Sequence, residues 1–160
     1  MAISVITVDY QDKQQAQDVM ACLSAYALDP MGGGEALSEF VEQNLITQLQ
    51  QRSNVFSVLC YVDGEIAALA NCVEGFSTFS AKPLINFHDI VVLGAYRGRG
   101  LTQYLFDYVE AIAIEKGCCK LTLEVLEGNT IAKKAYEKVG FGSYELDPEM
   151  GQAVFWQKKL

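Results

Sequence analysis

The residues whose types and spacing best fit a chemical role lie in segment 88–102, where an apolar stretch leads into a turn rich in arginine and glycine. The turn contains Arg97, Gly98, Arg99 and Gly100, and an amphipathic stretch follows it. The first N–H groups of a helix have no partner within the helix, and the helix dipole adds about half a positive charge there. Glycine lets a ligand approach the backbone, and arginine supplies further charge. This arrangement predicts a site that binds a diphosphate.

Two familiar nucleotide-binding motifs do not match this turn. A P-loop requires Gly-Lys-Ser/Thr, which the segment lacks, and the dinucleotide fingerprint requires a third glycine where Gln103 stands. The turn therefore favours neither ATP nor NAD. By itself, a turn of this kind also fits an ordinary connection between a strand and a helix, so its interpretation depends on the rest of the chain.

Two segments of the chain resemble the signatures of one protein family. Residues 97–102, Arg-Gly-Arg-Gly-Leu-Thr, resemble the acetyl-CoA-binding signature Arg/Gln-x-x-Gly-x-Gly/Ala of the GNAT superfamily of N-acetyltransferases, from which Thr102 departs. Residues 129–141 are similar to the second signature of that superfamily, Asn-x-x-Ala-x-x-x-Tyr-x-x-x-Gly-Phe. The two signatures occur in the expected order. The resemblance covers nearly the whole chain and is weakest in residues 1–54.

The resemblance implies acetyl-CoA as co-substrate and no metal ion. It also implies that the strand before the turn separates from its parallel neighbour and that the pantetheine arm lies in the gap. Backbone groups of Val91 and Leu93 are expected to contact that arm while their side chains pack in the core. The implied cofactor-binding residues lie on this strand, on the turn and on the last helix: Val91, Val92, Leu93, Arg97, Gly98, Arg99, Gly100, Leu101, Thr102, Asn129, Lys133 and Tyr136.

The resemblance assigns the proton donor to Tyr136, which matches the tyrosine that protonates the departing CoA thiolate in this superfamily. A hydroxyl donor close to a leaving thiolate stabilises it. Without the resemblance, a tyrosine on a helix is typical of a half-buried core aromatic. Asn129 is expected to cap the last helix, and the resemblance adds a contact with the cofactor or with the local backbone.

Attack by an amine requires that the ammonium group first lose a proton, so a base is expected near the acceptor. Our candidate is His88, the only histidine, because histidine titrates close to neutral pH and this one lies on the strand before the turn. Neighbouring residues of a strand point to opposite faces, so His88 and Asp89 share a pocket only if a bulge intervenes. The alternative is a structural histidine, with Asp89, Glu74 or a chain of waters accepting the proton.

Acidic side chains are expected to bind the acceptor, because carboxylates attract ammonium groups. The candidates are Glu35, Glu74, Asp89 and Glu124. In this superfamily the acceptor usually contacts the loop between the first two helices, here 29–35, and the segment equivalent to 75–83. Three successive glycines at 32–34 predict that the loop is flexible. Segment 74–96 is also similar to the diamine and polyamine branch, so we expect a small-molecule acceptor with a primary amine, polyamine-like or amino-acid-like.

These residues fit two classes of function. The first is an enzyme that transfers the acetyl group of acetyl-CoA to an amine by direct attack in a ternary complex. The second is a catalytically silent acyl-CoA sensor or regulatory module that keeps the cofactor cleft without turnover. Release of the CoA thiol in the presence of amines distinguishes the two.

The elements that position these residues follow from the spacing of apolar residues, which alternates between strand-like runs and helical stripes. We expect strands at 3–8, 55–62, 66–76, 85–93, 120–125, 141–144 and 153–157, and helices after Asp12, after Gly34, from Leu101 to near Gly117 and at 130–139. Asp63-Gly64 predicts a hairpin turn. The order β-α-α-β-β-β-α-β-α-β-β predicts an α/β fold with a mixed sheet. The resemblance implies seven strands with a splay between strands 4 and 5.

Composition limits what this chain can be. Its 160 residues fit one domain, residues 1–160, and its net charge of −8 argues against a nucleic-acid partner. An apolar run of about 20 residues and the features of a signal peptide are both missing, so neither a membrane span nor export is expected and we expect a cytoplasmic protein. Its five cysteines are expected to stay reduced. GNAT proteins are often dimers, so the resemblance is compatible with a homodimer.

Overall fold

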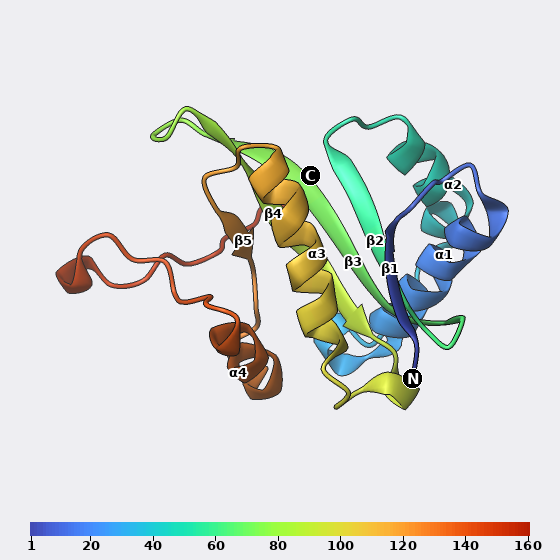
Figure 1. Ribbon diagram of the computed structural model, residues 1–160. Helices are drawn as coiled ribbons and strands as arrows, with labels where there is room; N and C mark the ends of the chain where they lie inside the picture. The colour runs from blue at the N-terminus through green and yellow to red at the C-terminus, as the bar shows by residue number, and fades with distance from the viewer. The chain divides into compact units, whose positions relative to one another are not determined.

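The computed structural model describes all residues from Met1 to Leu160. The chain forms two compact units, Met1–Leu123 and Glu124–Leu160. The first unit contains the strands and most of the helices: β1 (Ile3–Thr7), α1 (Lys13–Leu28), α2 (Glu39–Gln50), β2 (Val55–Val62), β3 (Glu65–Ser77), β4 (Lys82–Val92), α3 (Leu101–Glu115) and β5 (Leu121–Leu123) (Figure 1). The second unit contains α4 (Thr130–Lys138) and a 3₁₀ turn at Pro148–Met150.

The strands form one mixed sheet in the order β1-β2-β3-β4-β5. Neighbours are antiparallel from β1 to β4, whereas β5 runs parallel to β4. The turn between β2 and β3 has φ of 52° at Asp63 and 88° at Gly64, the two positive values of a type I′ hairpin, as the Asp-Gly pair predicts. The predicted mixed α/β sheet is therefore confirmed for these strands.

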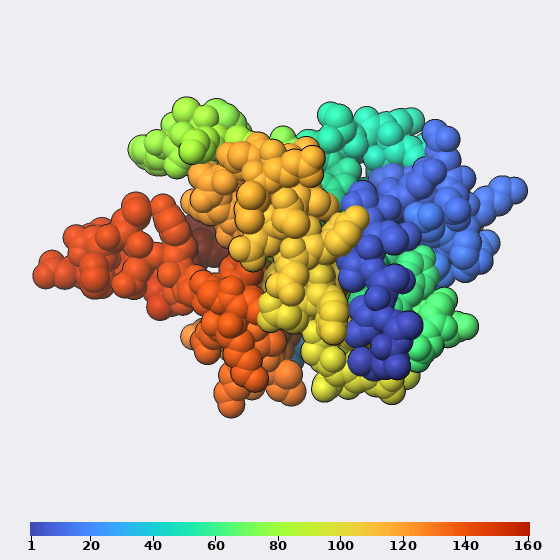
Figure 2. All heavy atoms as spheres, viewed as in Figure 1, coloured from blue at the N-terminus to red at the C-terminus, as the bar shows by residue number.

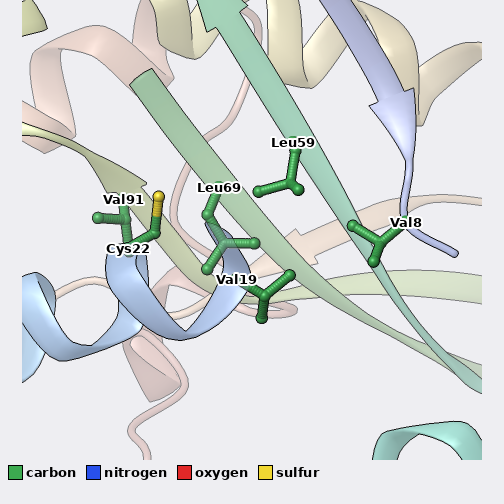
Figure 3. Close-up of a cluster of buried hydrophobic side chains, with 6 residues drawn as sticks. All are labelled: Val8, Val19, Cys22, Leu59, Leu69 and Val91. Carbon is green, nitrogen blue, oxygen red and sulfur yellow. The ribbon is translucent and has the colours of Figure 1, made fainter. Parts of the chain in front are cut away.

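Helices cover both faces of the sheet (Figure 1). α1 begins as predicted, because Asp12 accepts hydrogen bonds from the first free N–H groups of the helix. Beneath α1, one face of the sheet contributes to a cluster of buried side chains: Val8, Val19, Cys22, Leu59, Leu69 and Val91 (Figure 3). On the other face, Phe106 of α3 packs edge-on against Phe87 of β4, with ring centroids 4.8 Å apart. Because successive strand residues point alternately to these faces, the register of β4 decides which side chains reach each helix layer.

The sheet has five strands, where the sequence predicted seven. The predicted strands at 141–144 and 153–157 form no ladder, and the only bridge there is an isolated antiparallel one between Glu145 and Gln152. Phe155 and Trp156 are 78% and 86% exposed, so the apolar residues that suggested a strand bury little surface. An apolar pattern produces a stable strand only where a partner edge and an apolar face are available to it.

None of the helices combines the length and the apolar character that crossing a membrane requires. The five cysteines are unpaired. Three of them, Cys22, Cys60 and Cys72, are buried in the first unit, whereas Cys119 is exposed.

Candidate active site

The turn after β4 has the backbone geometry that an anion site needs. Gly98 and Gly100 have φ of 76° and 75°, in the left-handed region that favours glycine. Gly100 immediately precedes α3, and no side chain caps that end of the helix. The N–H groups of Leu101 and Thr102 are therefore left for a ligand. A Cβ atom at either glycine would meet nothing within 4 Å, so conformation rather than crowding requires glycine here.

The two arginines of the turn have different surroundings. The Arg99 guanidinium lies over the ring of Tyr96, 5.2 Å from its centroid, in cation–π geometry. Arg97 is held by two oxygen atoms, because its Nη2 lies 2.8 Å from Asp29 Oδ2 and its Nε donates to the Val92 carbonyl at 3.1 Å. Arg97 therefore fastens the turn to the loop between α1 and α2.

That loop contains a 3₁₀ turn at Pro30–Gly32 and is hydrogen-bonded within itself. The Asp29 side chain accepts a hydrogen bond from the Met31 N–H at 2.9 Å, and its carbonyl accepts one from Gly32 at 2.8 Å. The Met31 amide, and next the Arg97 guanidinium, lower the pKa of the Asp29 carboxyl group. A Cβ atom on Gly32 would lie 1.9 Å from the carbonyl oxygen of Tyr26, so only glycine lets the loop fold back onto α1. These contacts define the conformation of the expected acceptor loop, and its predicted flexibility stays a prediction.

The edge of β4 beside this turn is open. β5 is only three residues long, and its parallel ladder ends at the pair Phe87 and Leu123, whereas β4 continues to Val92. From His88 onward, this edge of β4 has no neighbouring strand in the sheet. The geometry agrees with the gap that was predicted between the fourth and fifth strands.

The backbone groups on this open edge belong to Ile90 and Val92. The N–H of Leu93 donates to the carbonyl of Ala67 in β3 at 2.9 Å, so it points into the sheet. Hydrogen bonds alternate along an antiparallel pair, so Val91 also faces β3 while Ile90 and Val92 face away. The expectation that backbone groups of Val91 and Leu93 contact the pantetheine arm is therefore wrong by one residue. The sequence showed the strand but not its register.

A β-bulge at His88 changes the face to which β4 side chains point. Asn71 of β3 pairs with Asp89, and the next β3 residue, Cys72, pairs with Phe87, so His88 is the inserted residue. As a result Phe87 packs against α3, whereas Asp89 lies on the face that α1 covers. The bulge that His88 and Asp89 need in order to share a pocket is present. The His88 side chain is exposed.

Asp89 ends a row of polar side chains that crosses three strands. Asn71 Nδ2 donates to Asp89 Oδ2 at 3.0 Å, and Ser57 Oγ donates to Asn71 Oδ1 at 2.6 Å. Ser57 Oγ also lies 2.8 Å from the hydroxyl oxygen of Tyr10. Ser57 is fully buried and Asn71 is 7% exposed. Sequence reasoning missed Tyr10, Ser57 and Asn71, although a serine and an asparagine within otherwise apolar strands were a usable signal.

The groups around this row are neutral at physiological pH. Burial, and next the charge of Asp89, raise the pKa of Tyr26 on α1. Burial, and next the same charge, raise the pKa of the Cys72 thiol to about 12. Burial also raises the pKa of Tyr10. Tyr10, Tyr26 and Cys72 therefore add no charge of their own beside the carboxyl group of Asp89.

The other predicted acceptor carboxylates are not gathered beside the turn. Glu74 Oε2 lies 2.9 Å from Lys116 Nζ, just beyond the C-terminal end of α3. α3 has 15 residues, so about 20 Å separate this ion pair from the turn at the other end of the helix, and the role of Glu74 as acceptor ligand or base stays a prediction. Glu35 is exposed in the loop before α2, and Glu124 begins the second unit. No group of three or more His, Cys, Asp and Glu side chains is placed to hold a metal ion.

Segment 75–83, expected near the acceptor, forms the tip of the β3–β4 hairpin. The tip is exposed around Phe79 and projects from the first unit in lime green (Figure 2). It precedes β4, whereas the turn of residues 97–102 follows β4. The 11 residues of β4 span about 33 Å at roughly 3.3 Å per residue, so the tip and the turn lie at opposite ends of the strand.

The second unit carries the second signature on α4. Asn129 caps this helix as predicted, because its side chain accepts a hydrogen bond from the Ala132 N–H at 3.2 Å. Tyr136 is half-buried, and its ring lies edge-on to Phe141 with centroids 6.5 Å apart. Lys133 lies three residues before Tyr136 on the same helix. The cofactor contacts of Asn129, Lys133 and Tyr136 stay predictions.

The fold and the turn together define an α/β protein whose sheet presents an open strand edge beside an anion-binding helix terminus. A sequence profile described as the Acetyltransferase (GNAT) family matches residues 15–141. The chain therefore belongs to the GNAT family and is an acetyl-CoA-dependent acetyltransferase.

Individual relatives agree with this membership. Aminoglycoside N(6')-acetyltransferase type 1 of Salmonella typhimurium is 23% identical over 115 residues, which cover 70% of this chain and 75% of that protein. Thialysine N-epsilon-acetyltransferase of Bos taurus is 35% identical over 76 residues, 43% of this chain and 44% of that protein. The solved structure of aminoglycoside N-acetyltransferase AAC(6')-Iy in complex with CoA is similar with a TM-score of 0.76 at 17% identity, over 99% of this chain and 96% of that chain. At this identity, the structural likeness shows the fold alone.

Proposed function

We propose that this chain transfers the acetyl group of acetyl-CoA to the primary amine of a small molecule, by direct attack of the amine on the thioester in a ternary complex. One observation carries the proposal. The free N–H groups at the start of α3 follow the open edge of β4 after the connection 93–100, so one continuous segment offers an anion site and a backbone edge. A diphosphate followed by an amide-bearing arm is the ligand that such a segment fits.

The residues of the turn fit the diphosphate of acetyl-CoA. The N–H groups of Leu101 and Thr102 face outward, and the left-handed backbone at Gly98 and Gly100 leaves open space around them. Arg99 is exposed and adds positive charge. The N–H groups of Ile90 and Val92 and the carbonyl of Ile90 supply hydrogen bonds to the amides of the pantetheine arm, whereas the Val92 carbonyl already accepts from Arg97. In this proposal Asn129, Lys133 and Tyr136 complete the binding of the cofactor.

The acceptor is an amine that is cationic in solution. Asp89 lies on the α1 face of β4, next to Ile90 on the open edge, and a carboxylate in this position attracts an ammonium group. Glu35 adds negative charge in the loop before α2. Relatives named for aminoglycosides and for thialysine support an amine acceptor. Aminoglycosides therefore join polyamines and amino-acid-like amines as the acceptors to test.

Catalysis in this proposal needs one base and one acid. His88 takes a proton from the acceptor ammonium group, and Tyr136 donates a proton to the departing CoA thiolate. The bulge leaves His88 without a partner in the register between β3 and β4, beside the open edge.

A homodimer is part of the proposal. Phe155 and Trp156 of the second unit are 78% and 86% exposed, and adjacent aromatic residues of this kind are typical of association surfaces. Light scattering coupled to size-exclusion chromatography should give twice the monomer mass. The double variant Phe155→Ser, Trp156→Ser should give the monomer mass.

The assay for the proposed function is release of the CoA thiol from acetyl-CoA in the presence of polyamines, amino acids, aminoglycosides and N-terminal peptides. We expect release well above hydrolysis with at least one small amine. Tight CoA binding without release for any acceptor would favour the silent sensor instead.

Variants assign the roles. Tyr136→Phe should lower kcat far more than it weakens acetyl-CoA binding, and Tyr144→Phe, at an exposed tyrosine of the same unit, serves as the matched control. His88→Ala should shift the pH–rate profile, and an unchanged profile removes His88 as the base.

A further inference from the structure

The buried polar row that ends at Asp89 has no counterpart in the next row of the same face. Two residues further along, the equivalent positions of the three strands are Leu59, Leu69 and Val91, all part of the apolar cluster beneath α1. A polar group in such a position costs stability unless its hydrogen bonds are made. The buried polar groups of Ser57 and Asn71 make their hydrogen bonds with each other and with Asp89, so each residue of the row depends on its neighbour.

The charge of Asp89 sets the direction of every hydrogen bond in the row. An ionised carboxylate only accepts, so Asn71 must turn its Nδ2 to Asp89 and its Oδ1 to Ser57. The single hydroxyl proton of Ser57 then goes to Asn71 Oδ1. Ser57 Oγ must therefore accept from Tyr10, whose hydroxyl lies 2.8 Å away. Donors consequently point the same way along the whole row, and such alignment strengthens each bond.

The row uses one carboxylate oxygen of Asp89, Oδ2, and makes no bond to the other, Oδ1. Asn71 binds Oδ2, while Oδ1 remains on a half-exposed carboxyl group adjoining the open edge of β4. The opposite end of the row is also fixed, because the Tyr10 carbonyl accepts a hydrogen bond from Gln50 Nε2 at the end of α2. The row is thus held at Tyr10 by α2 and at Asp89 by β4, so hydrogen bonds to buried residues set the orientation of the Asp89 carboxylate.

We propose that Tyr10, Ser57 and Asn71 are positioning residues, and that their hydrogen-bond chain aims Asp89 Oδ1 at the ammonium group of the acceptor. This inference rests on the proposed acetyl transfer to an amine and extends it to three residues that touch neither substrate. The acetyl-CoA site does not depend on the chain, because the turn of residues 97–102 and the edge at Ile90 and Val92 take no part in it.

The test measures kcat/KM for an accepted amine, the Kd of acetyl-CoA and the melting temperature of variants in two backgrounds. Asn71→Leu removes the bond to Asp89 at similar volume, whereas Ser57→Ala and Tyr10→Phe each remove one hydroxyl further along the chain. In the wild-type background we expect Asn71→Leu to lower kcat/KM for the amine about tenfold or more, and the other two about two- to fivefold. The Kd of acetyl-CoA should stay within about twofold.

The second background, Asp89→Asn, separates positioning from a structural role. If the chain acts through the carboxylate, Ser57→Ala and Tyr10→Phe should change kcat/KM by less than about twofold once Asp89 is replaced. The matched control is Tyr61→Phe, which removes a tyrosine hydroxyl that donates to Asp18 Oδ2 at 2.8 Å on the same sheet and should leave kcat/KM for the amine unchanged.

The outcomes are distinct. Equal losses in both backgrounds, or wild-type kcat/KM in the three single variants, overturn the inference while leaving acetyl transfer intact. If Asn71→Leu does not fold, the kcat/KM values of Ser57→Ala and Tyr10→Phe in the two backgrounds decide whether the inference holds. A wild-type protein that acetylates no amine refutes the proposed function itself, and the inference fails with it.

Discussion

Replacing Gly100 by alanine tests the conformation on which the cofactor site depends. Gly100 has φ of 75°, and the added Cβ atom would meet nothing within 4 Å, so the cost is one of backbone conformation alone. A non-glycine residue in the left-handed region costs about 1–2 kcal/mol. The smaller entropy of the unfolded alanine chain offsets about 0.5 kcal/mol of that cost. The net loss of stability should be about 1 kcal/mol.

Two measurements follow from this estimate. A loss of about 1 kcal/mol lowers the melting temperature of a chain of this size by about 2–4 °C. If the turn relieves the strain by leaving its left-handed conformation, the N–H groups of Leu101 and Thr102 lose their common orientation. Calorimetric titration should then show acetyl-CoA binding weakened up to about tenfold, the equivalent of about 1.4 kcal/mol.

Gly94→Ala is the matched control for this prediction. Gly94 lies in the 3₁₀ turn Gly94–Tyr96, has no positive φ and also leaves open space around a Cβ atom. Alanine there should be neutral, or stabilising by about 0.5 kcal/mol, with unchanged acetyl-CoA affinity. If Gly100→Ala matches this control in both melting temperature and affinity, the left-handed turn is not the cofactor site that we propose.

Three further predictions concern the loop, its ion pair and the thiols. Gly32→Ala places a Cβ atom 1.9 Å from a main-chain oxygen, so unfolding in urea should show a loss of about 1–3 kcal/mol, and an unchanged midpoint would contradict the packing of this loop. The pKa of Asp29 is lowered, so its stabilising effect is complete above about pH 4 and is lost as the pH falls through the lowered value. Asp29→Asn should therefore melt at a lower temperature than wild type at pH 7 and converge with it in acid. A thiol reagent should modify exposed Cys119 in the native protein, whereas three buried thiols should react only on unfolding: Cys22, Cys60 and Cys72. Fast modification of all five would show that the core opens readily.

Local signals predicted most of the elements because their causes are local. Asp12 caps α1 with its own side chain, Asn129 caps α4 in the same way, and Asp63-Gly64 adopts the two positive φ values that its hairpin requires. The turn at Gly98 and Gly100 was predicted in the same way, because these two glycines adopt its positive φ values themselves. In each case, the residues that determine the conformation lie within a few positions of it.

The errors arose where the structure depends on a partner distant in the sequence. The segments 141–144 and 153–157 have strand-like patterns but lie exposed, and no local signal tells whether a sheet edge receives them. The ion pair of Glu74 with Lys116, 42 residues away, could not be predicted from the sequence either. The same holds for the close approach of Gly32 to Tyr26, which depends on how the chain folds back onto α1.

In the proposed function, the register of β4 lets one strand contact two substrates. Backbone groups on an open edge and side chains on a sheet face point in perpendicular directions, so Ile90 and Val92 are available to the cofactor while Asp89 is available to the acceptor. Without the extra residue at His88, Phe87 and Asp89 would share a face, and an apolar ring packed against α3 would place the carboxylate beneath that helix. The bulge frees Asp89 from this constraint and directs it to the α1 layer, where Asn71 holds it. A single inserted residue therefore lets β4 place an apolar ring against α3 and a carboxylate against the α1 layer.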